Sequence, residues 1–189
     1  MDGESPEPFE RGIFESETVR FIVGRDQVVF SIHSQILRDD SEYYKHLPDP
    51  LPDQELPNED PETFHVLLNW LYRKTLSPLY VEPGDTLPFQ LYTLAERLEM
   101  SVLLSEIEQY LLSSPWISPE TWCHPAAIRH VYENSAPGSK ARKFILEWGW
   151  PDCHCHSYSG TPDCFSFLSQ TFDIPLDYIK DISKATRRM

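Results

Sequence analysis

The sequence predicts an α+β fold: a small sheet with helices packed around it, followed by a mostly helical extension. Three observations predict it: an alternating hairpin near the N-terminus, a helix after Pro61 that is apolar on most sides, and shorter amphipathic helices after residue 113. A chain of 189 residues is long enough for one domain with an appendage. We place a disordered acidic lead-in at 1–13, the main domain at 14–113 and a helical extension at 114–189.

The hairpin is predicted from period-two alternation on both sides of the turn Gly24–Gln27. Alternate residues share one apolar face, namely Val19, Phe21 and Val23 in the first strand and Val28, Phe30 and Ile32 in the second. A helix from Ser34 to Tyr44 follows, and Ser34 or a neighbour is expected to cap it. His33, between strand and helix, is interpreted as a half-buried structural residue bonded to a backbone carbonyl. A titrating switch is the alternative.

Residues 47–58 contain four prolines and predict an extended loop with a short edge strand around Gln54–Leu56. Asp60 and Pro61 then give the N-cap and first position of the clearest helix. Large apolar residues fall on most sides of that helix: Phe64, Val66, Leu67, Leu68, Trp70, Leu71 and Tyr72. We expect it to be central and buried.

Two further helical stripes complete the main domain. They are Leu87, Leu91, Leu94, Ala95 and Leu98, then Leu104, Ile107 and Leu111, with a break near Met100-Ser101. The extension has shorter patterns, of which Ile128, Val131 and Tyr132 form one and Phe144, Ile145 and Trp148, after a cap at Ser139, form another. Phe165, Phe167 and Leu168 and then Leu176, Tyr178, Ile179 and Ile182 suggest two more. Trp116, Trp122, Trp148 and Trp150 predict a small second core, with an exposed peptide-binding patch as the alternative.

The charge and the absence of targeting signals limit the classes of function. The net charge is −14, and residues 1–62 carry 16 acidic but only 5 basic side chains. Carboxylates release no counterions from a polyanion, so nucleic-acid binding by this half is not expected. No apolar run is long enough for a membrane helix and the acidic N-terminus is unlike a signal peptide, so we expect an intracellular protein, cytoplasmic or nuclear.

One cluster of residues has the chemistry of a metal site. Cysteine and histidine, the residue types that bind zinc, occur together at Cys153, His154, Cys155, His156 and Cys164. The usual C-x-x-C spacing is absent, so we predict no metal and no cofactor; a zinc-stabilised binding module is the alternative. No phosphate loop, dinucleotide fingerprint, H-E-x-x-H or G-x-S-x-G motif occurs, and we expect no catalytic residues and no enzyme activity.

The order of these motifs resembles the opening of BTB/POZ domains, in the form common in filamentous fungi. The matching residues are Ser16-Glu17, Val23-Gly24, Phe30, Ile32-His33, Leu37, Ser41, Tyr43-Tyr44, Leu56-Pro57, Asp60-Pro61-Glu62, Phe64 and Trp70-Leu71-Tyr72. Leu91-Tyr92, with Leu94-Ala95-Glu96-Arg97-Leu98 after it, is similar to a later helix of that family. The resemblance covers residues 14–112 well and 113–150 loosely.

The resemblance implies a protein-interaction scaffold or adaptor that acts by self-association, as a dimer, without chemistry of its own. By this analogy the self-association face is expected at Ile13, Phe14, Gln35, Arg38, Asp39, Tyr43 and Tyr44. Some members of the family bind cullin scaffolds of ubiquitin ligases through an aromatic-x-Glu motif in the loop before the Leu-Pro strand. Residues 47–55 contain no such motif, so a cullin adaptor is kept as an alternative function.

Overall fold

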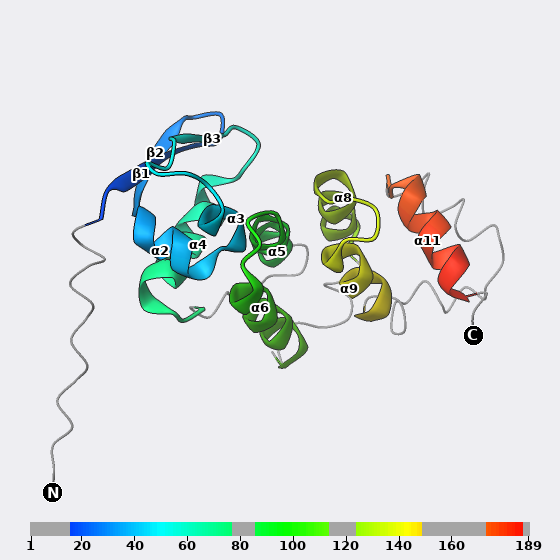
Figure 1. The fold of residues 1–189 in the computed structure, drawn as a ribbon. Coiled ribbons are helices and arrows are strands. Elements are labelled where there is room, and N and C mark those ends of the chain that lie inside the picture. Colours follow the sequence, from blue (N-terminus) through cyan, green and yellow to red (C-terminus); the bar gives the residue numbers. More distant parts are fainter. Residues whose placement is uncertain (1–15, 77–85, 114–123, 149–172, 187–189) are drawn as a thin grey trace, which may run out of the picture. The chain divides into compact units, whose positions relative to one another are not determined.

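The computed structural model describes residues 16–76, 86–113, 124–148 and 173–186. Figure 1 labels the helices and strands of these residues. They fall into two compact units. The first unit holds the described residues up to Thr75 together with Leu98–Met100, and the second holds the remainder. The domain boundary that we place after Ser113 stays a prediction.

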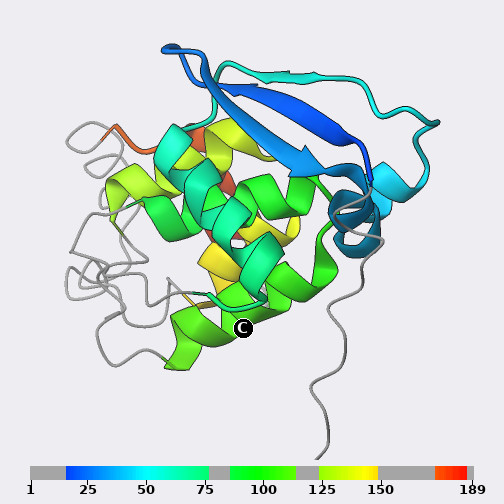
Figure 2. The same ribbon diagram turned by 90° about the vertical axis from the view of Figure 1, so that its left-hand side faces the viewer.

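The first unit contains a three-stranded sheet in the order β2-β1-β3. Strand β1 (Thr18–Val23) pairs antiparallel with β2 (Val28–His33) and parallel with β3 (Gln54–Leu56). Figure 2 shows β1 and β2 as one twisted layer. The predicted hairpin and the short edge strand are therefore confirmed.

The turn between β1 and β2 depends on Gly24. Its φ is +74°, and a Cβ there would lie 3.0 Å from Cγ of Pro61. The backbone can approach Pro61 this closely only because glycine has no side chain.

Helix α4 (Pro61–Arg73) supplies the centre of the first unit, as predicted. Asp60 caps it: Oδ2 accepts from the backbone N–H of Thr63 at 2.9 Å. Phe64 and Trp70 are at most 1% exposed, and the Phe64 ring lies 5.1 Å from that of Phe21 on β1. The helix ends at Lys74, whose left-handed backbone lets its N–H donate to the carbonyl of Trp70 at 2.7 Å.

The predicted helix from Ser34 to Tyr44 is wrong in one respect, because it is two helices, α2 (Ser34–Asp40) and α3 (Glu42–Lys45). The break is at Ser41, which has extended backbone and is fully buried. Its hydroxyl donates to the carbonyl of Leu98 at 2.5 Å and accepts from the N–H of Tyr44 at 3.2 Å. The side-chain cap expected near Ser34 is also wrong, since the N-cap is His33 and its side chain makes no capping bond.

The second unit is helical in its described part. Its elements are α5 (Leu87–Arg97), α6 (Ser101–Ser113), α8 (Pro125–Asn134), α9 (Lys140–Trp148) and α11 (Leu176–Thr186). Helix α5 packs against α6, α8 and α9, and α11 packs against α8 and α9. Most residues of the predicted stripes on these helices are buried, and the break falls before Ser101 as expected. The exceptions are Leu176, which is 66% exposed, and Leu87 and Ile179, which are half-buried.

Polar groups tie these helices together. Arg142 is 6% exposed; its guanidinium donates to the carbonyls of Tyr132 and Ser135, each at 2.7 Å, and lies 4.4 Å from the centre of the Tyr132 ring. The Tyr132 hydroxyl donates to Asp181 at 3.3 Å. Burial, followed by the nearby carboxylate of Asp181, raises the pKa of Tyr132 above its usual value.

Candidate functional site

The predicted interface residues of α2 and α3 lie at the surface of the first unit, with one exception. Gln35, Asp39 and Tyr43 are exposed and Arg38 is half-buried. The ring of Tyr44 is 1% exposed and packs edge-on against Phe21 at 6.2 Å. We call Gln35, Arg38, Asp39 and Tyr43 the α2–α3 surface.

Tyr43 is the large aromatic residue of this surface. It is 41% exposed, and its ring stands at 84° to that of Tyr44, with 5.1 Å between centroids. Because Tyr44 is fixed in the core, Tyr43 rests on a rigid support. An exposed aromatic held in this way loses little conformational entropy when a partner covers it.

The polar residues of the α2–α3 surface are also held in place. Arg38 donates to the carbonyls of Tyr44 and Leu47, each at 2.9 Å, and pairs with Asp49. These carbonyls follow α2 in the chain, so Arg38 fixes the path of the segment that leaves α3. One turn of helix joins Gln35 to Asp39, whose carboxylate accepts from the Gln35 amide at 2.7 Å. The other two predicted interface residues, Ile13 and Phe14, lie outside the described residues.

The loop before β3, where cullin-binding relatives would carry their motif, is pinned to the sheet. Asp53 accepts from the backbone N–H of Arg20 at 3.1 Å and from its guanidinium at 2.9 and 2.6 Å. These hydrogen bonds lower the pKa of Asp53 and raise that of Arg20. Leu51 is buried at 8% exposure. The loop therefore presents backbone and carboxylates to solvent rather than an aromatic side chain.

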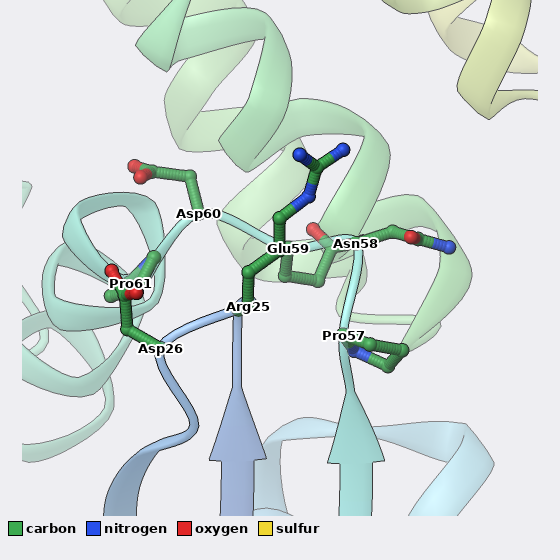
Figure 3. A pocket seen from close by; sticks show the side chains of 8 residues that line it. Arg25, Asp26, Pro57, Asn58, Glu59, Asp60 and Pro61 are labelled. Atoms are coloured by element: carbon green, nitrogen blue, oxygen red, sulfur yellow. The ribbon is translucent and has the colours of Figure 1, made fainter.

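An open hollow of about 250 Å³ lies where β1 and β3 end. It is lined by Gly24, Arg25 and Asp26 of the turn and by residues 57–61. Figure 3 shows Arg25 rising from the end of β1 beside Asn58 and Glu59. Asp60 is already used as the cap of α4. The lining mixes one cation with several carboxylates, and this arrangement is that of a solvated surface rather than of an acid–base pair.

His33 is half-buried as predicted, and it contacts a tyrosine hydroxyl of α4. Nδ1 lies 2.7 Å from the hydroxyl of Tyr72 on α4, and the His33 backbone N–H donates to the same hydroxyl at 3.3 Å. Both contacts hold the His33 ring against α4. The sequence could not show this contact, because Tyr72 is 39 residues away.

Other predicted features cannot be placed. Cys153, His154, Cys155, His156 and Cys164 lie outside the described residues, as do Trp116, Trp122, Trp150 and the side chain of Trp148. Within the described ranges, no three His, Cys, Asp or Glu side chains gather as a metal site. A search of the same ranges finds no helix long and apolar enough to cross a membrane.

The described surface therefore offers a rigid exposed aromatic and fixed polar groups over a small α+β core, which is the character of an interaction module. The family model of the BTB/POZ domain matches residues 14–115, more than half of the chain. The chain belongs to the BTB/POZ domain family, whose domains are protein–protein interaction modules. No curated protein matches it. The fungal type that we predict stays a prediction.

Proposed function

We propose that this protein is a non-enzymatic scaffold or adaptor that self-associates through the α2–α3 surface. The observation that carries the proposal is Tyr43, an aromatic side chain that is 41% exposed yet fixed edge-on against the buried Tyr44. Interface residues that dominate affinity are commonly large aromatics of this kind.

The charges of the same surface support a contact between identical copies. Asp39 carries a negative charge and Arg38 a positive one, next to each other in the chain. In a two-fold contact the same patch meets itself, so Asp39 of one copy can approach Arg38 of the other. Such a pair offsets part of the repulsion between chains that each carry a net charge of −14.

Sedimentation of purified protein over a range of micromolar concentrations tests the proposal. We expect a dimer whose dissociation constant rises about 30-fold in Tyr43→Ala, because the two Tyr43 side chains that the dimer loses together contribute about 2 kcal/mol. Asp39→Lys should also weaken the dimer, because it places a lysine near Arg38 of the other copy.

Leu112→Ala is the matched control, because Leu112 is 44% exposed on α6 and lies on no part of the α2–α3 surface. It should leave the dissociation constant unchanged. Protein that stays monomeric throughout the range, or a dimer disturbed by Leu112→Ala and not by Tyr43→Ala, would contradict the proposal.

A further inference from the structure

The two edges of the sheet differ in how they are protected. Strand β3 has only three residues, follows Pro52 and carries Glu55. Proline, charge and short length are the usual means by which proteins prevent an edge strand from pairing with another chain. Strand β2 has six residues, Val-Val-Phe-Ser-Ile-His, with no proline, acid, lysine or arginine. It has none of these protections.

The ladder shows which backbone groups of β2 point outward. The N–H of Ser34 donates to the carbonyl of Glu17 at 2.8 Å, so these two residues form a hydrogen-bonded pair. Such pairs alternate in antiparallel strands. Phe30 therefore directs its N–H and C=O toward β1, whereas Val29 and Ser31 direct theirs to the open edge.

The outward N–H and C=O groups of Val29 and Ser31 differ from the next ones along the strand, because they have no partner among the described residues. The next outward N–H, that of His33, is taken by the Tyr72 hydroxyl. Val29 and Ser31 have no corresponding partner in the part of the chain that is described. Their side chains are exposed as well, Val29 to 58%.

We propose that β2 pairs antiparallel with β2 of a second copy, about a two-fold axis at Phe30. In this register Val29 of each copy lies opposite Ser31 of the other, and the outward N–H and C=O groups of both residues bond across the edge. The two sheets become one continuous sheet.

The strand is suited to meet its own copy. A two-fold axis places like charges near each other on any charged strand, which is destabilising, and β2 carries no acid, lysine or arginine. The axis also places Phe30 opposite Phe30 in a non-hydrogen-bonded pair, where side chains approach most closely. Each ring is already oriented by Phe64, at 4.9 Å between centroids. Aromatic cross-strand pairs are among the stabilising ones.

The size of the contact sets its role. A stable protein–protein interface buries about 800 Å² of surface on each partner. Six residues of an edge strand bury much less than this, so the β2 contact is weak by itself. It gains strength when copies are already held together elsewhere, because the effective concentration is then high. Two different two-fold contacts on one chain link copies beyond a dimer. The β2 contact goes beyond the proposed function and does not require it.

Charge substitution at the edge tests this inference by sedimentation. Val29→Lys/Ser31→Lys places lysine opposite lysine in both cross-strand positions, and the β2 contact should weaken at least about tenfold. Where both contacts form, the wild type makes species larger than the α2–α3 dimer, and these species should then be lost while the dimer stays. Thr18→Lys is the control: it adds positive charge to the exposed Thr18 of the central strand β1, and it should leave assembly unchanged.

Mixing two variants tests the register. Val29→Glu/Ser31→Glu should fail to make the β2 contact alone, for the same reason as the lysine variant. An equimolar mixture of the two places lysine opposite glutamate, and the contact should return. Circular dichroism of each variant must match the wild type, which separates a lost contact from a lost fold.

The same variants in a Tyr43→Ala background separate the two contacts. If the α2–α3 surface fails as an interface and the β2 edge holds, Tyr43→Ala protein still forms a dimer that the lysine pair abolishes. The inference is overturned if sedimentation gives the same assembly sizes for the wild type, for Val29→Lys/Ser31→Lys and for its mixture with Val29→Glu/Ser31→Glu. In that case something other than a second copy covers the β2 edge.

Discussion

The first unit is centred on Phe64 and Trp70, buried apolar side chains of a helix whose cap, Asp60, immediately precedes it. The second unit also has an apolar core, but polar side chains hold the ends of its helices in place. Arg142 satisfies carbonyls at the end of α8, and the carboxylate of Glu96 on α5 accepts from the N–H groups of Lys140 and Ala141 at 2.6 and 3.3 Å.

This difference changes what a substitution does in each unit. Apolar packing loses free energy in proportion to the surface and cavity created. A buried polar network loses it when one partner is removed and the others stay buried without a bond. Four predictions test this comparison.

The largest effect is expected at the centre of the first unit. Trp70→Ala should lower the free energy of unfolding by about 3–5 kcal/mol, because a large, fully buried side chain leaves a cavity. Urea denaturation followed by circular dichroism measures it. Arg73→Ala, at an exposed position of the same helix, should change the value by less than about 0.5 kcal/mol. Equal losses for both variants would mean that α4 is not central.

Arg142→Met should lower the stability of the second unit by about 2–4 kcal/mol, because the carbonyls of Tyr132 and Ser135 lose a charged donor while the aliphatic part is kept. Lys143→Met is the matched control, since Lys143 is exposed and adjacent. The same denaturation curves compare them. A neutral Arg142→Met would show that apolar packing, and not this network, holds α8 and α9.

The two helix caps compare a local signal with a distant one. Asp60→Ala removes the cap of α4, and Glu96→Ala removes the acceptor at the start of α9; each should cost about 1 kcal/mol. Asp60→Asn keeps a capping oxygen and should cost less. Thermal unfolding of the three variants measures these differences. If Asp60→Ala lowers the unfolding temperature and Glu96→Ala does not, the contact between Glu96 and the start of α9 does not stabilise the second unit.

The smallest effect is expected at the exposed pair of Arg20 and Asp53. The pKa of Asp53 is lowered by hydrogen bonds from Arg20, so the pair contributes above the ordinary pKa of an unfolded aspartate. That contribution is lost as the pH falls through the lowered pKa of the folded protein. Stability measured from pH 5 downward should therefore decline slightly more in the wild type than in Asp53→Asn. Identical profiles would mean that solvent screens the pair completely.

Much of the first unit was predictable because its signals are local. The β1–β2 hairpin follows from alternation around a glycine turn, and α4 follows from Asp60-Pro61 and the apolar residues after it. Trp70 is buried as the pattern required. The break at Ser41 was not predictable, because its hydroxyl bonds to the carbonyl of Leu98, 57 residues away.

The candidate site was predictable in part. Family resemblance pointed to Gln35, Arg38, Asp39 and Tyr43, and all four lie at least partly at the surface. The burial of Tyr44, the neighbour of Tyr43, depends on the position of Phe21, which no local pattern gives. The open edge at Val29 was also missed, since alternation shows which side chains are apolar but not which strand of a sheet lies at its edge.

By itself, the sequence determined the family, the hairpin, the main buried helix and most helical stripes, because period and capping residues act within a few positions along the chain. Only the tertiary structure decided which polar groups are satisfied across long separations: His33 with Tyr72, Ser41 with Leu98 and Glu96 with the start of α9. Each of these bonds needs two segments brought together by the burial of other residues, so neither partner carries a signal of the contact in its own neighbourhood.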